Sequence, residues 1–527
     1  MYKIMKHKIK RILILLTIIG LKVSVTQAQI YHPDDKEGLR AFLRQPSAVA
    51  GQINAQRLGL SMADTINWQI DEVWVTKVSN LIWNNETPKR LTDIGDSSNL
   101  GWFSSRLAGT LDAKKWKALT NLYCLDNQLT ALDAGGCKAL RFLHCSGNLL
   151  TVLDVSTNTE LRELYISLNR LTNLDVSANT ELIHLRCEYN YDQLTALYIG
   201  GSTTLKTLYC GINQLTTLDV SGCTALEILD CHRNQLTALN ISGCMALETM
   251  NCHNNQLTSL DVSERKSLRG LWLEYNQLTA LDVDGCTALE TLACTRNLLT
   301  SLNVSESTAL RELNCSWNQL TTLDVSRCTE LTHLLCNSNH LLLSDLFVAS
   351  EILKNNSGAG VLGSQTLQKQ SAVIGTEVVF EPPQNIFNDI YTQFTVTKNG
   401  SAAPIGDYSV TNGKITFNAE GIYIATMTNA EIISVLYEPT CLTVEYEVKM
   451  PTSISEIPQT NTLRAWAYDG LLYITGLSEG KGLSVYNVSG ALVYQTVAVS
   501  DKVEIPLNVK GGYIVISGNR SVKVVNH

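Results

Sequence analysis

The segment from Cys231 to His253, CHRNQLTALNISGCMALETMNCH, concentrates residue types that bind metals or carry out redox chemistry. It holds three cysteines, Cys231, Cys244 and Cys252, and two histidines, His232 and His253. Thiolate and imidazole groups are common zinc ligands, and paired cysteines form disulfides. Either chemistry requires the backbone to bring these side chains together. The elements that carry them therefore decide whether they form a site.

A sequence repeat explains the spacing within this segment. Eleven asparagines follow one another at intervals of 21 residues, with one interval of 23 between Asn190 and Asn213. Each follows a segment of the form L-x-x-L-x-C/L/I-x-x, in which Met250 once replaces the second leucine. Eleven copies at one period predict a solenoid whose coils bury their apolar faces against each other. The asparagines are Asn127, Asn148, Asn169, Asn190, Asn213, Asn234, Asn255, Asn276, Asn297, Asn318 and Asn339.

The repeat unit, LxxLxCxxNQLTxLDVSxCTA, resembles the leucine-rich repeat in its short bacterial forms, and the likeness covers residues 119–345. The resemblance implies a mainly β solenoid with a parallel sheet on its concave face, as in internalin-like bacterial adhesion proteins. Side chains alternate along such strands, so we expect Leu229 and Cys231 to point inward and Asp230 and His232 outward. The amide of the asparagine that follows can pair with backbone groups that would otherwise be buried unsatisfied.

The repeat also sorts the fifteen cysteines. Nine occupy the inward strand position, where Ile166 and Leu273 substitute, five occupy the next corner, and Cys441 lies outside the repeats. Buried free cysteine behaves as a small apolar residue, so we expect reduced core thiols, with a few disulfides as the alternative. The inward cysteines are Cys124, Cys145, Cys187, Cys210, Cys231, Cys252, Cys294, Cys315 and Cys336. The corner cysteines are Cys137, Cys223, Cys244, Cys286 and Cys328.

Residues of the opening segment therefore lie in three environments: the inward strand position, the corner and the outer surface of the sheet. Because they cannot converge on one ion, we expect neither a metal nor a cofactor. His232 and His253 are expected to be neighbours on the outer surface of the sheet, with Asp230 close. A surface metal site at these histidines is the alternative. Because the cysteines face the core and no catalytic motif of the common hydrolase, kinase or zinc-protease types occurs, we expect no enzyme activity.

Binding is the function that the outward strand positions favour. Solenoids commonly bind partners on their concave face, and tyrosine, tryptophan and arginine supply much of the energy of protein interfaces. The candidate ligand-binding residues are Tyr123, His144, Tyr165, Arg186, Tyr209, Asp230 and Trp272. We expect a monomeric adhesin that binds a partner protein, such as a host extracellular protein. The alternatives are glycan capture by the aromatic stripe and a structural scaffold of the cell surface.

Composition and the N-terminal residues address partners and location. The net charge of −8 and the lack of a basic patch give no reason to expect nucleic-acid binding. Residues 1–28 resemble a secretory signal peptide, with five basic residues before the apolar run ILILLTIIGL. No later segment is apolar over the length needed to span a bilayer, so we expect no transmembrane segment.

The regions that flank the repeats are expected to fold separately. Residues 29–118 predict an N-terminal cap, with an amphipathic helix at 34–47 and a strand-like segment at 64–75. A divergent coil is expected just before residue 119. Residues 346–453 contain short alternating segments separated by turn signals, which predict an immunoglobulin-like β-sandwich spacer.

Residues 454–527 predict a second, smaller β-domain. This region resembles the C-terminal sorting domain of type IX secretion cargo, which is found in the Bacteroidetes phylum. The likeness rests on Val485, Tyr486, Gly490, Gly512 and Tyr513, in the patterns V-Y-x-x-x-G and G-x-Y-I-V. It implies translocation across the outer membrane by the type IX machinery, followed by attachment to the cell surface or release.

Overall fold

The computed structural model describes residues 31–66, 73–78, 80–95, 102, 104–190, 193–432, 440–450, 463–468, 470–507, 511–518 and 520–526. The described residues divide into two compact units. The first lies within Met1–Thr366 and Ile432–Thr440, and the second within Leu367–Glu431 and Cys441–His527. The predicted signal peptide, residues 1–28, lies outside the described residues. Within the described ranges, no helix has the length and apolar character required to cross a membrane.

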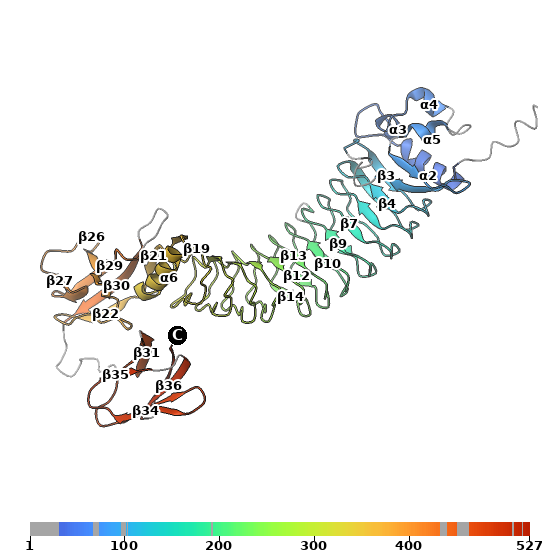
Figure 1. Cartoon of the computed structure of the whole chain (residues 1–527). Coiled ribbons are helices and arrows are strands. Elements are labelled where there is room, and N and C mark those ends of the chain that lie inside the picture. The colour runs from blue at the N-terminus through green and yellow to red at the C-terminus, as the bar shows by residue number, and fades with distance from the viewer. Residues whose placement is uncertain are drawn as a thin grey trace, which may run out of the picture. The chain divides into compact units, whose positions relative to one another are not determined.

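A solenoid forms most of the first unit, and its main sheet has fourteen strands (Figure 1). From β2 onward each strand pairs in parallel with its neighbours in unbroken register; Tyr209, for example, pairs with Asp230. This confirms the predicted mainly β fold with coils of about 21 residues. In spatial order the strands are β1 (Leu81–Trp83), β2 (Leu91–Ile94), β4 (Asn121–Tyr123), β6 (Phe142–His144), β7 (Glu163–Tyr165), β9 (His184–Arg186), β11 (Thr207–Tyr209), β13 (Ile228–Asp230), β15 (Thr249–Asn251), β16 (Gly270–Trp272), β17 (Thr291–Ala293), β18 (Glu312–Asn314), β19 (His333–Leu335) and β20 (Ala359–Val361).

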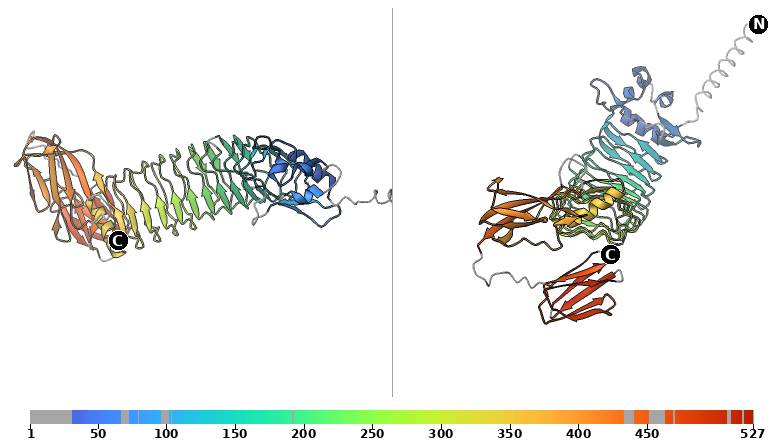
Figure 2. Two further views of the ribbon diagram at one scale, coloured as in Figure 1. Left: turned by 90° about the horizontal axis from the view of Figure 1, so that it is seen from above. Right: turned by 60° about the vertical axis from the view of Figure 1, so that its left-hand side comes forward.

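The return segment of each coil runs on the other side of the solenoid, so that successive coils stack as seen in Figure 2. Here short strands pair in parallel between some coils, and Leu and Val side chains complete the core. The pairs are β3 (Ala108–Asp112) with β5 (Gln128–Asp133), β8 (Asn173–Asp175) with β10 (Ala196–Tyr198), and β12 (Thr217–Asp219) with β14 (Ala238–Asn240).

The repeated asparagines join each coil to the one before it. The Asn148 side-chain nitrogen donates to the carbonyl oxygens of Cys124 and Cys145, both at 3.0 Å. Its side-chain oxygen accepts a hydrogen bond from the Leu129 backbone N–H at 3.0 Å. Related bonds recur along the stack, and all eleven asparagines are buried. The expectation that this amide satisfies buried backbone groups is confirmed.

The corner position has a shared role that the sequence interpretation missed. The Cys137 thiol donates to the Ala113 carbonyl oxygen at 3.1 Å, one coil earlier. At the same position of other coils, the Asn158 amide and the Arg265 guanidinium donate to the equivalent carbonyl oxygens at 3.0 and 3.1 Å. Cysteine, asparagine and arginine can each occupy this position because each supplies a donor, whereas the Ser307 hydroxyl at the same position is buried without a hydrogen-bond partner. All fourteen solenoid cysteines are buried free thiols, as expected.

Four short helices cover the N-terminal end of the stack: α2 (Pro33–Leu43), α3 (Asn54–Arg57), α4 (Met62–Ile66) and α5 (Val73–Lys77). Helix α2 confirms the predicted amphipathic helix, and its Phe42 stacks on Trp102 with ring centroids 5.4 Å apart. The strand predicted at 64–75 is wrong at its two ends, since Met62–Ile66 and Val73–Lys77 are helical; residues 67–72 lie outside the described residues. Trp74 and Val75 are 1% exposed, so their burial in the cap outweighs their strand propensity.

Helix α6 (Leu343–Asn355) covers the other end of the stack and buries Leu346 and Leu353. Strand β20 follows and pairs in parallel with β19. The boundary predicted at residue 345 is therefore too early, because the solenoid sheet continues to Val361. Strand β21 (Ser364–Thr366) comes next in the chain.

The first part of the second unit contains β sheets that pack on each other, and its immunoglobulin-like type stays a prediction. Phe417 of β28 lies against Tyr423 of β29 and Tyr446 of β30, with ring centroids 5.0 and 5.2 Å apart. One layer contains β22 (Gln370–Val373), β30 (Cys441–Lys449), β29 (Gly421–Thr428), β25 (Gln393–Lys398) and β26 (Ser401–Ala402). The other contains β27 (Tyr408–Thr411) and β28 (Lys414–Phe417), and β23 (Ile386–Phe387) pairs with β24 (Ile390–Tyr391).

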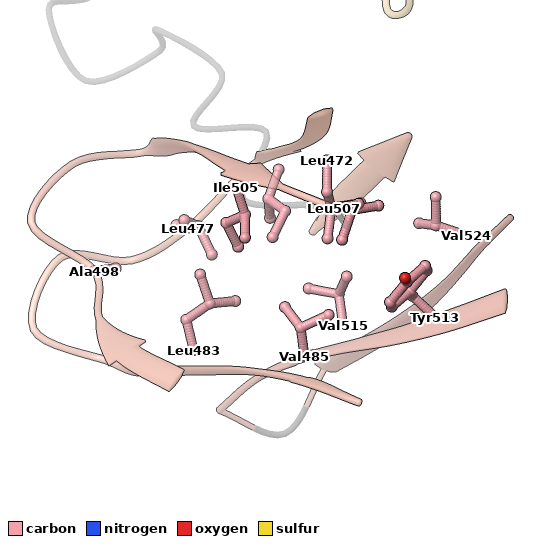
Figure 3. Close-up of a cluster of buried hydrophobic side chains, with 11 residues drawn as sticks. Leu472, Leu477, Leu483, Val485, Ala498, Ile505, Leu507, Tyr513, Val515 and Val524 are labelled. Atoms are coloured by element: carbon pink, nitrogen blue, oxygen red, sulfur yellow. The ribbon is translucent and has the colours of Figure 1, made fainter. Parts of the chain in front are cut away.

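The C-terminal β-domain has two sheets around a separate core (Figure 3). Val485 and Tyr513 of the predicted sorting motif lie in this core, and Tyr486 pairs with Ile514. Gly490 lies in the turn after β33 at a φ of +82°, a conformation that favours glycine. Gly512 belongs to β36 and pairs with β37. The strands are β31 (Arg464–Tyr468), β32 (Leu471–Thr475), β35 (Lys502–Pro506), β34 (Leu492–Val497), β33 (Gly482–Asn487), β36 (Gly511–Ser517) and β37 (Arg520–Asn526).

Candidate functional site

The outward side chains of the fourteen-stranded sheet form one surface, called the sheet face below. In the strands of the central coils the middle side chain is buried, as Leu229 is in β13, and the side chains on either side point outward. The register places Asp230 beside Tyr209 and Asn251 beside Trp272. The predicted site residues Tyr123, His144, Tyr165, Arg186, Tyr209, Asp230 and Trp272 are each the third residue of a strand, so they follow one row.

The first part of the row is an aromatic cluster of Tyr123, Phe142, His144 and Tyr165. Tyr123 stacks on Phe142 with ring centroids 4.3 Å apart and is only 6% exposed. This corrects the expectation of an open outward ring, because the stacked Phe142 ring covers one face of Tyr123. The His144 ring lies 5.1 Å from that of Tyr165. Burial, with a smaller contribution from the Arg186 charge, lowers the pKa of His144 to about 4.

Arg186 connects the aromatic cluster to the next part of the row. Its guanidinium carbon lies 4.2 Å from the centre of the Tyr209 ring, and its Nε lies 3.5 Å from a carboxylate oxygen of Glu188. A cation over an aromatic face is attracted by the ring quadrupole. Arg186 is thus held by both a ring and a carboxylate on the sheet face.

A cavity of about 520 Å³ lies on the sheet face at the centre of the solenoid. It brings together Tyr209, Asp230 and Trp272 of the predicted residues, whereas His144 and Tyr165 belong to the aromatic cluster. The cavity is lined by Tyr209, Ile228, Leu229, Asp230, Thr249, Asn251, His253, Asn254, Trp272, Glu274 and Tyr275. We call it the Trp272 pocket.

Gly270 provides the place where the Trp272 ring lies. A Cβ added at Gly270 would come within 2.5 Å of the ring atom Cη2, so the ring rests against the glycine backbone. A second hollow of about 270 Å³ adjoins the other side of Trp272 and includes Ala293 and Leu335. The Trp272 indole therefore separates two depressions and lines both of them.

The two histidines of the opening segment are neighbours, as expected. The rings of His232 and His253 stack with centroids 4.7 Å apart, and His232 Nδ1 lies 2.5 Å from Asp230 Oδ1. His253 Nδ1 lies 2.6 Å from the Asn251 side-chain oxygen. Burial and the neighbouring His232 lower the pKa of His253. The described residues contain no group of three or more potential ligands arranged to hold a metal ion.

Tyr275 is the pocket residue that sequence reasoning missed. It precedes Asn276, one of the repeated asparagines, and has a φ of +55°, so it belongs to a turn and not to a strand. Trp317 occupies the same place two coils later, also at +55°, and both rings are about half exposed. Arg296 lies over both rings, at 5.3 and 4.7 Å from their centres. Bulky residues at a position suited to glycine or asparagine were the available signal.

Comparisons with known proteins address the fold. No protein-family model matches the sequence, and no curated protein matches it. Among solved structures, the functional domain of InlJ from Listeria monocytogenes is 27% identical, with a TM-score of 0.50 and coverage of 68% of this chain and 81% of that one. YopM from Yersinia enterocolitica is 24% identical over 47% and 56% of the chains (TM-score 0.37). The internalin InlF from Listeria monocytogenes is 19% identical over 64% and 90% (TM-score 0.33).

The likeness to InlJ supports a leucine-rich-repeat solenoid of the internalin kind. The InlJ domain is described as including a cysteine ladder. In the present chain, nine cysteines stack at the inward position of the sheet with 0% exposure. The predicted fold class is thus supported by both the coil geometry and a known structure.

Proposed function

We propose that this chain is a non-enzymatic binding protein that recognises a partner protein through the sheet face, with the Trp272 pocket as the anchor point. The observation that carries the proposal is the pocket itself. An indole, two phenols and two carboxylates converge there, on an otherwise extended surface. Buried aromatic anchors surrounded by polar groups dominate the binding energy of protein interfaces.

Binding is favoured over catalysis by the chemistry of the potential nucleophiles. Burial raises the pKa of the Cys124 and Cys315 thiols to about 12, so neither forms a thiolate near neutral pH. Cys231 is fully buried as well, and its pKa is raised well above the ordinary value by Cys252 and by burial. The groups that remain on the sheet face are suited to contact and charge recognition.

The proposal is tested by capture of extracellular-matrix and mucin proteins on the immobilised full chain. Replacing Tyr165, Tyr209 and Trp272 together with alanine should abolish capture. Tyr198→Ala is the matched control, because Tyr198 is 58% exposed on β10 of the return side. Equal capture by the triple variant would refute the proposal. Retained protein capture with loss of glycan-array signal would instead assign the face to a sugar.

We further propose that the protein is exported and displayed on the cell surface or released. The support is the signal-like N-terminus and the resemblance of residues 454–527 to a type IX sorting domain. That region folds as a β-domain with a core of its own, as expected for a sorting domain that can be removed from the rest of the chain. Deleting residues 455–527 should leave the protein in the periplasm of a type IX host. Normal surface delivery of the truncated chain would disprove sorting by this domain.

A further inference from the structure

The Trp272 pocket contains a carboxylate that lacks a full set of hydrogen-bond donors. Glu274 lines the pocket, and its Oε2 is shielded from solvent without a hydrogen-bond partner. Burial raises the pKa of this side chain, and a backbone hydrogen bond opposes the rise only in part. Buried acceptors without donors cost about 1–3 kcal/mol, so a ligand that supplies donors gains binding energy here.

Carboxylates dominate the charge of the sheet face around the pocket. Asp230 also lines the pocket, and its Oδ1 lies 2.5 Å from His232 Nδ1. Arg186 lies on the sheet face, where it pairs with Tyr209 in the register and is already in an ion pair with Glu188. The carboxylates at outward positions of the sheet face are Glu163, Glu188, Asp230, Glu274 and Glu312. The surface is therefore complementary to a positively charged group.

The molecule shows twice how aromatic rings hold a guanidinium group, once on the sheet face and once at the turns that follow its strands. Arg186 combines the Tyr209 ring at 4.2 Å with the Glu188 carboxylate at 3.5 Å. Arg296 lies over the rings of both Tyr275 and Trp317. The Trp272 pocket offers the two elements that hold Arg186, an aromatic ring and carboxylates. None of its lining residues is an arginine or a lysine, and Arg296 lies over the lining residue Tyr275. Guanidinium is planar, stacks on rings and carries five donors.

We propose that the Trp272 pocket binds the guanidinium group of an arginine side chain on the partner protein, with Trp272 as the stacking surface and Glu274 as the counter-charge. This inference rests on the proposed function, because it names the chemistry of the partner at the same site. It predicts that the partner presents an exposed arginine where it meets the centre of the solenoid.

The direct test uses butylguanidinium as the probe and butylurea as its neutral near-isostere. Tryptophan fluorescence of the full chain is followed during titration, and Trp272→Phe identifies the part of the signal that comes from the pocket. We expect saturable binding of butylguanidinium and none of butylurea. Glu274→Gln should weaken butylguanidinium binding roughly fivefold. Glu330→Gln changes an exposed carboxylate in the turn before β19, outside the sheet face, so it is the control and should leave the affinity unchanged.

Three results would overturn the inference: no saturable signal, equal binding of butylurea, or unchanged affinity in Glu274→Gln. If Glu274→Gln does not fold by circular dichroism, the comparison of the two probes on the unmodified chain still decides. Failure here is distinct from failure of the proposed function, which the capture experiment tests without a probe. Loss of capture in the triple alanine variant, together with no butylguanidinium binding, would retain the function and reject the arginine.

Discussion

Trp272 depends on a single glycine for its orientation, and this gives the first prediction. In Gly270→Ala, the new Cβ would lie 2.5 Å from the indole, so the ring must move away. We expect partner capture to fall about tenfold, a loss of roughly 1.4 kcal/mol in binding. The free energy of unfolding should change by less than about 1 kcal/mol, because alanine is tolerated in strands.

Thr291→Ala is the control for this change, since Thr291 pairs with Gly270 in the next coil. Urea denaturation and capture are measured for both variants. If Gly270→Ala captures the partner as well as the unmodified chain does, the indole is not the anchor.

His144 gives a prediction about acid. Its folded pKa of about 4 lies below the ordinary 6.5, so folding favours the neutral ring. The corresponding stability is present above pH 6.5 and is lost as the pH falls through 4. In His144→Gln, the loss of unfolding free energy between pH 7 and pH 4.5 should be smaller by about 1–2 kcal/mol. Urea denaturation at both pH values measures this, with His333→Gln as the control; identical losses in the two variants would contradict it.

The two cysteine positions of a coil are both buried, but the corner position favours a hydrogen-bond donor and the inward strand position favours an apolar side chain. The Cys286 thiol at a corner donates to the Val262 carbonyl oxygen, one coil earlier, at 3.1 Å, and the Asn158 amide donates in the same way to the Ala134 carbonyl oxygen. Cys286→Asn should therefore keep the stability of the solenoid, whereas Cys286→Val should cost about 1–2 kcal/mol by removing the donor.

Cys294 at the inward strand position is the matched comparison. It sits in an apolar column at 0% exposure, so Cys294→Asn buries an amide and should cost about 2–3 kcal/mol or more. Thermal or urea unfolding ranks the three variants. A Cys286→Asn variant as unstable as Cys294→Asn would show that the corner thiol acts only by packing.

The repeat predicts the elements of the solenoid because every coil must bury the same apolar positions and turn at the same place. Leucines at fixed spacing mark the strands, and the asparagine marks the turn that needs an amide. The prediction failed where no repeat constrains the chain. Residues 73–77 have the composition of a strand but form a helix, because Trp74 finds its core in the cap. Helix α6 was missed for a similar reason, since it serves to cover the last coil.

The site was predictable only in part. Strand alternation located Tyr209, Asp230 and Trp272 in one row, and the structure brings them to one pocket. It did not predict that Phe142 covers Tyr123, because burial of one ring by its neighbour depends on rotamers. Tyr275 was missed because it belongs to a turn whose side chain reaches the same pocket. Such convergence of strand and turn residues follows from three-dimensional curvature and not from spacing.

We expect the solenoid coils to stay packed together in the native protein, and the reactivity of the buried thiols measures this. The fourteen solenoid cysteines are buried, and burial raises the pKa of thiols such as Cys145 and Cys210 well above the ordinary value. We expect iodoacetamide to leave them unmodified in the native protein at pH 8 and to label them when urea unfolds the stack. Mass spectrometry counts the labels. Rapid labelling of individual coils without urea would mean that the stack opens locally.

The central claim is that a partner protein docks on the sheet face at the Trp272 pocket. A photo-reactive amino acid introduced at Asn251, which lines the pocket, tests it directly, with the same group at Tyr198 on the return side as comparison. The account predicts that irradiation joins the captured partner to position 251 and not to position 198. Cross-linking at position 198 with none at position 251 would contradict it.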